Sequence, residues 1–290
     1  MITLDGHKLT IPEAWQIASL KKTCALAGNA RPLIRRSRKL VEKLAAQPRA
    51  IYGINTGFGP LSGFRVSGGD QEQHQIHLLH HLSVGQGTLF SENETRAIML
   101  ARANALARGF SGIREELIEL LIAALNQNVL PEIPREGSVG ASGDLVPLAH
   151  MARLLVGYGH AKFKGKRIPA TAALKKIGRR PAVLKCKEGL ALVNGTSAMT
   201  GLAALATHEA EKILRWSELL TACLFQALDG EPESLCQQLH KARGFRGQSL
   251  SAQRIADSLR TNPVFAKKID EHQWGSHAKP IEAGLEILAR

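Results

Sequence analysis

Apolar residues recur at helical spacing through most of the chain after its first fifty residues, and β-branched runs are few. The clearest helix start is Ser91, because a serine followed three residues later by Glu94 forms a capping box that satisfies two free backbone N–H groups. This pattern predicts a helix from residue 91 to about Arg108, where Gly109 ends it. The chain is therefore expected to be mainly α.

Two further segments have helical patterns separated by a loop. Residues 113–128 have one apolar stripe, and Pro131 and Pro134 end that segment. Small residues and glycines then predict a flexible loop that leads into a helix over residues 145–156, with Asp144 at its positive N-terminal end.

The basic segment 162–181 is interrupted by glycines and prolines, so it predicts a surface loop with a short helix inside. Residues 188–228 predict one long helix. No charge occurs from residue 189 to 207, which is almost the length of about 20 residues that a membrane span needs. Polar residues within it, among them Asn194, favour a helix buried in a protein bundle, and no membrane partner is expected.

The net charge of +13 raises nucleic acid as a partner. The basic residues, however, lie in separate clusters at 31–39, 162–167 and 175–180, and only 4% of residues are aromatic. Since base-stacking side chains do not alternate with the cations, these clusters are expected to be solvated faces, and no nucleic-acid partner is expected.

Four cysteines, Cys24, Cys186, Cys223 and Cys236, show no metal-ligand spacing. They fit a protein of the reducing cytoplasm. Charges near Met1 occupy the positions where a signal peptide would be apolar, so no secretion signal is predicted.

Ala141-Ser142-Gly143 is the segment that can carry unusual chemistry. Attack of the Gly143 nitrogen on the Ala141 carbonyl carbon would close a five-membered ring, and glycine is suited to it because it lacks a β-carbon and tolerates unusual dihedral angles. Loss of water from the ring and of the Ser142 hydroxyl would leave an exocyclic methylene. Such triplets are common, so the triplet alone does not identify the chemistry.

The surrounding run, Gly137-Ser-Val-Gly-Ala-Ser-Gly-Asp-Leu-Val-Pro-Leu-Ala-His150, resembles the signature of the histidine, phenylalanine and tyrosine ammonia-lyases. Tyr52-Gly-Ile-Asn-Thr-Gly-Phe-Gly59 is similar to the catalytic tyrosine loop of this family, and Asn194-Gly-Thr-Ser197 is similar to its asparagine motif. The resemblance extends as far as about Gly230 and thins after that.

The resemblance implies a 4-methylidene-imidazol-5-one electrophile formed from Ala141, Ser142 and Gly143, with no metal. Tyr52, as a phenolate, would remove the β-proton of an aromatic amino acid, on a glycine-rich loop that could act as a lid. Asn194 would hold the electrophile or the substrate amine. From the residues alone, Tyr52 would be a packed loop aromatic and Asn194 part of a tight turn.

The family fold would divide the chain into an N-terminal domain that bears the electrophile, residues 1–205, and a long helical bundle. Residues 206–290 would be a shortened part of that bundle, so the chain is expected to be C-terminally truncated. Family members are homotetramers, and an oligomer is therefore expected. Apolar helix faces from Leu202 to Leu224 would be partly uncovered.

His74, His77 and His81 share a face of a predicted helix, with His80 beside them. This spacing suits a metal, although a further ligand is not identifiable, and a solvated helix face is the alternative. The resemblance offers a third role: His81-Leu82 lies where the family selects its substrate, and the pair is similar to that of tyrosine-type members. The expected order of substrates is tyrosine, histidine, phenylalanine.

Beyond Leu228 the second tyrosine and the carboxylate-binding arginine of the family are not recognisable, and the stretch from Asp270 to Trp274 resembles none of its motifs. A non-catalytic remnant with a structural or binding role is therefore an alternative, and an aminomutase is a chemical variant. Arginines that could bind a carboxylate instead are Arg243, Arg246, Arg254 and Arg260.

Overall fold

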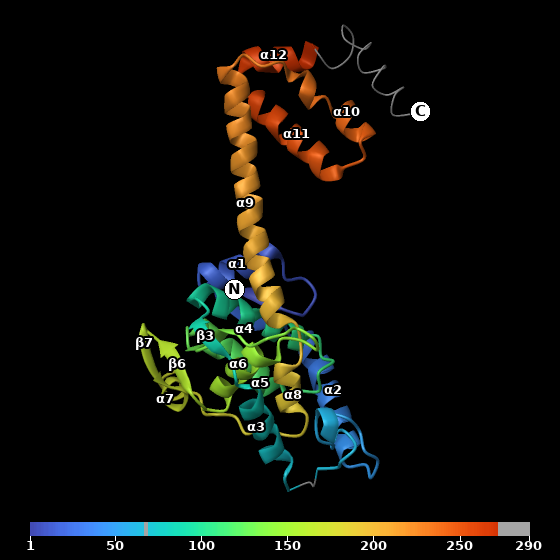
Figure 1. Cartoon of the computed structure of the whole chain (residues 1–290), viewed down its shortest axis with the longest axis vertical. Helices are drawn as coiled ribbons and strands as arrows, with labels where there is room; N and C mark the ends of the chain where they lie inside the picture. The colour runs from blue at the N-terminus through green and yellow to red at the C-terminus, as the bar shows by residue number, and fades with distance from the viewer. Residues whose placement is uncertain (67–68, 272–290) are drawn as a thin grey trace. The chain divides into compact units, whose positions relative to one another are not determined.

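The computed structural model describes residues 1–66 and 69–271. The chain forms two compact units, Met1–His208 and a second that begins at Glu209. Helix α9 (Ser197–Ala227) runs through this division, and the expected domain boundary between residues 205 and 206 falls within the same helix. The chain is mainly helical, as predicted (Figure 1).

Helices of the first unit surround a large apolar core that draws on nearly all of its elements, and Val41, Ile54 and Cys186 form a second, small cluster. The first fifty residues contribute two of these helices, which the apolar pattern did not indicate. The helices are α1 (Ile11–Ser19), α2 (Ala30–Ala45), α3 (Gln71–Leu82), α4 (Glu92–Ala107), α5 (Glu115–Asn126), α6 (Leu145–Leu155), α7 (Ala170–Lys176) and α8 (Glu188–Val193), with a 3-10 turn at Gly59–Leu61.

Short strands of the first unit form three small sheets within the described residues. One is a parallel pair and the others are antiparallel. The strands are β1 (Ile2–Leu4) with β2 (Cys24–Leu26), β3 (Gln86–Leu89) with β5 (Pro134–Glu136), and β4 (Leu130–Pro131) with β6 (His160–Phe163) and β7 (Lys166–Pro169).

Helix α4 confirms the predicted capping box. Ser91 Oγ accepts from the Glu94 N–H at 3.4 Å, and the Ser91 N–H donates to Glu94 Oε2 at 2.8 Å. The helix ends before Gly109, whose φ of +76° lies in the left-handed region that favours glycine. The helices predicted at 113–128 and 145–156 correspond to α5 and α6.

Residues 162–181 contain the predicted short helix, α7, but the segment before it is a β-hairpin where a loop was predicted. Strands β6 and β7 pair in register from His160 with Pro169 to Phe163 with Lys166, and α7 follows. Lys164 and Gly165 both have positive φ, 49° and 77°, as a two-residue hairpin turn requires. Lys-Gly is a weaker turn signal than Asn-Gly, so the sequence pattern does not indicate the hairpin.

The helix predicted over residues 188–228 is broken. Helix α8 ends at Val193, and α9 starts at Ser197 after a bend. Met199 and Thr200 are exposed, so α9 is not buried on all sides within the single chain. By length and composition alone, the stretch Glu188–Ala227 is apolar enough to cross a membrane; its 18-residue apolar window has a mean hydropathy of 1.3 and is 39% buried.

The second unit has a small core of its own, made by Ala222, Ala256, Leu259, Phe265 and Ile269. Apolar residues of the α9 face expected to be uncovered are exposed: Leu214 by 46%, Leu220 by 60% and Leu224 by 59%. The remaining elements are a 3-10 turn at Pro232–Leu235, α10 (Gln237–Ala242), α11 (Arg246–Leu259) and α12 (Pro263–Glu271).

Candidate active site

The Tyr52 loop, residues 51–57, is shaped by two buried polar side chains. Asn55 Oδ1 accepts from the Ile51 N–H at 2.7 Å, and Thr56 Oγ1 accepts from the Gly53 N–H at 3.3 Å. Tyr52 itself is 57% exposed. The interpretation of Tyr52 as a packed loop aromatic is therefore wrong, and the phenol is accessible to a ligand.

Gly53 brings this loop against α8. Its φ is +72°, and a β-carbon there would lie 2.6 Å from a methyl group of Leu190. Any larger residue would therefore push the loop away from the helix that leads to Asn194. Whether the loop opens and closes as a lid stays a prediction.

The loop that contains Ala141, Ser142 and Gly143 lies against the bend that follows Asn194. Gly143 has a φ of +115°, and a β-carbon there would lie 2.8 Å from the Gly195 carbonyl oxygen. Only glycine fits this approach, and Ala141 and Ser142 are both exposed. A small residue, an accessible β-hydroxyl and a following residue that must be glycine fit the backbone-derived ring.

Asp144 fixes the same junction with its backbone and its side chain. Its N–H donates to the Gly195 carbonyl at 2.7 Å, and its Oδ2 accepts from the Met199 N–H at 2.8 Å. Asp144 lies at the start of α6, as predicted, but its carboxylate caps α9 instead of α6. The negative charge stabilises the positive end of that long helix and holds the two motifs together.

Arg102 of α4 was not identified from the sequence. It is 4% exposed, and its Nη2 donates to the carbonyl oxygens of Ala191 and Asn194, the latter at 3.0 Å. Burial lowers its pKa to about 10, so it stays a cation at neutral pH. An arginine between Ala101 and Ala103 of an apolar helix was the available signal.

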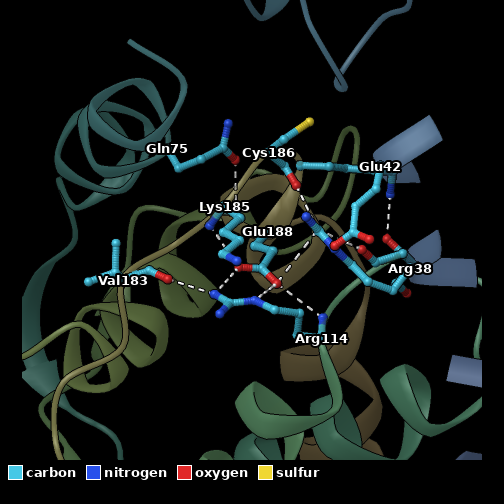
Figure 2. A network of polar contacts seen from close by, with 12 residues as sticks. Arg38, Glu42, Gln75, Arg114, Val183, Lys185, Cys186 and Glu188 are labelled. Carbon is cyan, nitrogen blue, oxygen red and sulfur yellow. Dashed lines mark hydrogen bonds and ion pairs between the residues drawn. The ribbon is translucent and has the colours of Figure 1, made fainter. Parts of the chain in front are cut away.

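Glu188, at the start of α8, is a second residue that the sequence did not single out. It is fully buried and accepts from Arg114 Nε at 2.8 Å, Arg114 Nη2 at 2.7 Å and the Lys185 N–H at 2.7 Å. Arg38 Nη1 lies 3.6 Å from Glu188 Oε1 (Figure 2). Arg38 is 7% exposed, so the expectation that its basic cluster is a solvated face is wrong for this residue.

His81 and Leu82 end α3, with His81 exposed and Leu82 partly buried against the core. Among residues 1–66 and 69–271, His81 has no hydrogen-bond partner, so its imidazole is free to bind a ligand. Gln75 of the same helix accepts from the Gly189 N–H at 2.9 Å. This bond joins the helix that carries His81 to the helix that leads to Asn194.

The other histidines of α3 have separate neighbours. His74 stacks on Phe58 at 4.6 Å, and His80 packs edge-on to Tyr158 at 4.7 Å. His77, His80 and His81 are exposed, which confirms the solvated-face interpretation for these three. The part of the chain that the structure describes holds no group of three His, Cys, Asp or Glu side chains suited to a metal.

Two buried imidazole nitrogens predict a pH-dependent stability. His74 and His150 have Nε2 atoms without a hydrogen-bond partner within the described residues. Burial lowers the pKa of both from the ordinary 6.5, with smaller contributions from His77 and Arg153. Below about pH 6.5 the unfolded chain therefore binds more protons than the folded chain. The contribution of these two histidines to the free energy of unfolding is fully present above about pH 6.5 and is lost as the pH decreases.

We expect the melting temperature of the chain to fall between about pH 7 and pH 5.5. The variant with His74→Gln and His150→Gln should have a shallower slope over the same range. Thermal unfolding measured across the range checks this, and an equal slope in both proteins would contradict it.

The site combines a glycine that can cyclise, an exposed tyrosine and an asparagine bend on a helical scaffold. The chain belongs to the aromatic amino acid lyase family, which it matches over residues 9–276. Among curated proteins, histidine ammonia-lyase of Geobacillus thermodenitrificans is 46% identical over 255 residues, covering 88% of this chain and 51% of the relative. That of Bacillus subtilis is 42% identical, covering 88% and 50%.

Solved structures agree with this assignment. Tyrosine aminomutase from Streptomyces globisporus superposes with a TM-score of 0.83 at 35% identity, covering 88% of this chain and 48% of that one. Histidine ammonia-lyase from Trypanosoma cruzi gives a TM-score of 0.80 at 33% identity, covering 88% and 50%. The chain thus spans about half the length of the relatives it matches.

Of the arginines considered for a carboxylate, two have acidic partners in the second unit. Arg254 lies 3.3 Å from Glu218, and Arg260 lies 3.3 Å from Asp270. The part of the Asp270 to Trp274 stretch from residue 272 onward lies outside the described residues.

Proposed function

We propose that this chain carries the electrophile-bearing part of an enzyme that eliminates ammonia from an aromatic L-amino acid to give the α,β-unsaturated acid. The main support for this proposal is that the Gly143 backbone contacts Gly195, the residue that directly follows Asn194. Tyr52 is exposed on a loop that packs against α8, the helix that leads to Asn194.

The cofactor proposed is the methylidene-imidazolone that the family uses. The Gly143 nitrogen would form a bond to the Ala141 carbonyl carbon, and two waters would leave, one of them with the Ser142 hydroxyl. The ring supplies an electrophile that takes up the substrate amine and makes it a better leaving group.

Tyr52 would act as the base. Its phenolate oxygen would take the β-proton of the substrate; the C–H electron pair would become the new double bond, and the C–N electron pair would leave with the amine. The exposed phenol suits a group that must reach a bound ligand.

Asn194 would hold the reacting centre by hydrogen bonds from its amide. Arg102 fixes the Asn194 carbonyl from the buried side and places a positive charge near the site. Preorganised donors and charges of this kind stabilise a transition state more than a flexible group does.

The His81-Leu82 pair favours tyrosine as the substrate, because a free imidazole can form a hydrogen bond with a phenol oxygen. Histidine is the second candidate, supported by the names of the curated relatives. Phenylalanine is third.

Replacing His81 with Phe is expected to shift preference from tyrosine toward phenylalanine by about 5- to 150-fold, since a substrate phenol that is buried on binding and left unpaired costs about 1–3 kcal/mol. Release of ammonia from tyrosine, histidine and phenylalanine, measured on both proteins, checks the expectation. His77→Phe, on the same helix, is the matched control and should leave the ratio unchanged. Preference of the unaltered protein for histidine or phenylalanine would overturn this order of substrates.

An aminomutase is the alternative reaction, supported by the similarity to a solved tyrosine aminomutase. It would return the ammonia to the β-carbon, and detection of a β-amino acid would distinguish it from elimination. We further propose a cytoplasmic homo-oligomer, for which the exposed apolar face of α9 offers a surface. An unmodified mass together with no turnover would favour a non-catalytic role.

A further inference from the structure

We propose that Cys186 and Glu188 are positioning residues: they hold the Tyr52 loop at a fixed position relative to Asn194. This inference rests on the proposed function. It concerns neither the ring nor a group that touches substrate. It concerns the segment of residues 185–194, in which Cys186 and Glu188 are buried, that contacts the Tyr52 loop and ends at Asn194.

The first contact is a thiol hydrogen bond. Cys186 Sγ donates to the Ile54 carbonyl oxygen at 2.7 Å, in the buried space between the two segments. Burial raises the pKa of the Cys186 thiol, so the group stays protonated and remains a donor at neutral pH. Ile54 is two residues from Tyr52, so this bond fixes the loop backbone close to the phenol.

Cys186 is itself held by a buried cation. Arg38 Nη1 donates to the Cys186 carbonyl at 3.0 Å and to the Gly112 carbonyl at 3.2 Å. The same nitrogen lies 3.6 Å from Glu188 Oε1. Figure 2 shows the resulting path of contacts from Glu188 through Arg38 to Cys186.

The Glu188 carboxylate, at one end of this chain of contacts, is itself held in place by Arg114. Arg114 binds both of its carboxylate oxygens, through Nε at 2.8 Å and Nη2 at 2.7 Å, and Arg114 also donates its backbone N–H to Oε1 at 3.0 Å. A carboxylate held by a bidentate guanidinium in a buried site has one defined geometry. Because α8 begins at Glu188, the first turn of this helix has a fixed position.

Helix α8 transmits that position to both functional residues. Leu190 packs against Gly53, next to Tyr52, and Asn194 follows the last turn of the helix. Asn55 and Thr56 make hydrogen bonds within the loop, whereas Leu190 of α8 and Cys186, two residues before α8, contact it from outside. A change at Cys186 or Glu188 is therefore expected to alter the placement of Tyr52 relative to Asn194.

The test compares Cys186→Ala with Cys186→Ser. Alanine removes the donor, whereas serine keeps an O–H that can donate to Ile54. Since a small misplacement of a catalytic group can cost about 100-fold, we expect kcat to fall about 10- to 100-fold in the alanine variant while KM changes less than about threefold. Serine should restore most of the loss.

A second readout does not depend on turnover. Amide hydrogen exchange of the peptide covering residues 51–57 should quicken in Cys186→Ala and stay near normal in Cys186→Ser. Cys24→Ala is the matched control, because Cys24 is also a buried thiol, and its neighbour is Asn126 in another part of the first unit. It should change neither exchange in the loop nor kcat.

Glu188→Gln tests the role of the Glu188 carboxylate. Glu115→Gln is its control, since Glu115 is also buried and pairs with Arg31 and Arg35. Glu188→Gln should lower kcat and quicken exchange in residues 51–57, whereas Glu115→Gln should leave that peptide unchanged. If Glu188→Gln does not fold, the cysteine series decides alone.

Normal kcat and normal loop exchange in Cys186→Ala would overturn the proposal. Equal losses in Cys186→Ala and Cys24→Ala would also overturn it, because they would show general destabilisation. If the unaltered protein shows neither the loss of two waters nor any turnover, the proposed function fails instead. The exchange comparison would still show whether Cys186 holds the loop.

Discussion

Replacing Ser142 with Ala is expected to leave a folded protein with the full encoded mass and no ammonia release. The unaltered protein should be two water molecules lighter than its sequence, because one water leaves the ring and the other takes the Ser142 hydroxyl. Alanine has no β-hydroxyl to lose, so the methylene cannot form. Ser142 is exposed, and its replacement removes no buried contact.

Intact-protein mass spectrometry and an ammonia assay on the same samples measure both parts of this prediction. Ser138→Ala is the matched control, since Ser138 is an exposed serine of the same loop that lies outside the proposed ring. It should keep the mass loss. An unmodified mass in the folded, unaltered protein would refute the ring, and turnover by Ser142→Ala would refute its role.

Tyr52→Phe is expected to separate ring formation from turnover. The variant should lose two waters like the unaltered protein, because Tyr52 is not part of the triplet. Its kcat should fall by about 10²- to 10⁴-fold, the usual contribution of a positioned acid or base. Loss of the phenol oxygen removes the base while the aromatic ring beside Gly53 stays nearly the same size.

The other tyrosine of the chain provides the control. Tyr158 is 45% exposed and packs against His80, so Tyr158→Phe removes a comparable hydroxyl elsewhere. It should change kcat by less than about threefold. Steady-state ammonia release with mass spectrometry checks both variants, and a kcat near normal in Tyr52→Phe would exclude this tyrosine as the base.

Residues that the sequence did not indicate share one property, which is that their partners are distant in the chain. Arg102 donates to carbonyl groups of Ala191 and Asn194, and Glu188 is held by Arg114 and Arg38. A charged residue within an apolar helix or at a helix start is expected to face solvent until its partner is known. Buried charges of this kind need several hydrogen bonds to offset their desolvation.

Local chemistry explains which elements could be predicted. The Ser91 capping box, the stripe of α5 and the entry to α6 depend on residues within one or two turns of each other, so the chain specifies them locally. The hairpin of β6 and β7 was missed, and the break at Asn194 was absent from the helix prediction, although Asn194-Gly195 by itself indicates a tight turn. Both depend on backbone conformations at a few residues that a tertiary contact selects.

The sequence by itself determined the family, the mainly helical fold and the residues proposed for the chemistry, Tyr52, Ala141, Ser142, Gly143 and Asn194. It could do so because these lie in short contiguous motifs whose residue types are required by local backbone geometry. Only the tertiary structure decided that Gly143 lies against Gly195, that the Asp144 carboxylate caps α9, and that Cys186 contacts the Tyr52 loop. Those contacts join segments dozens of residues apart, and burial, not local preference, selects them.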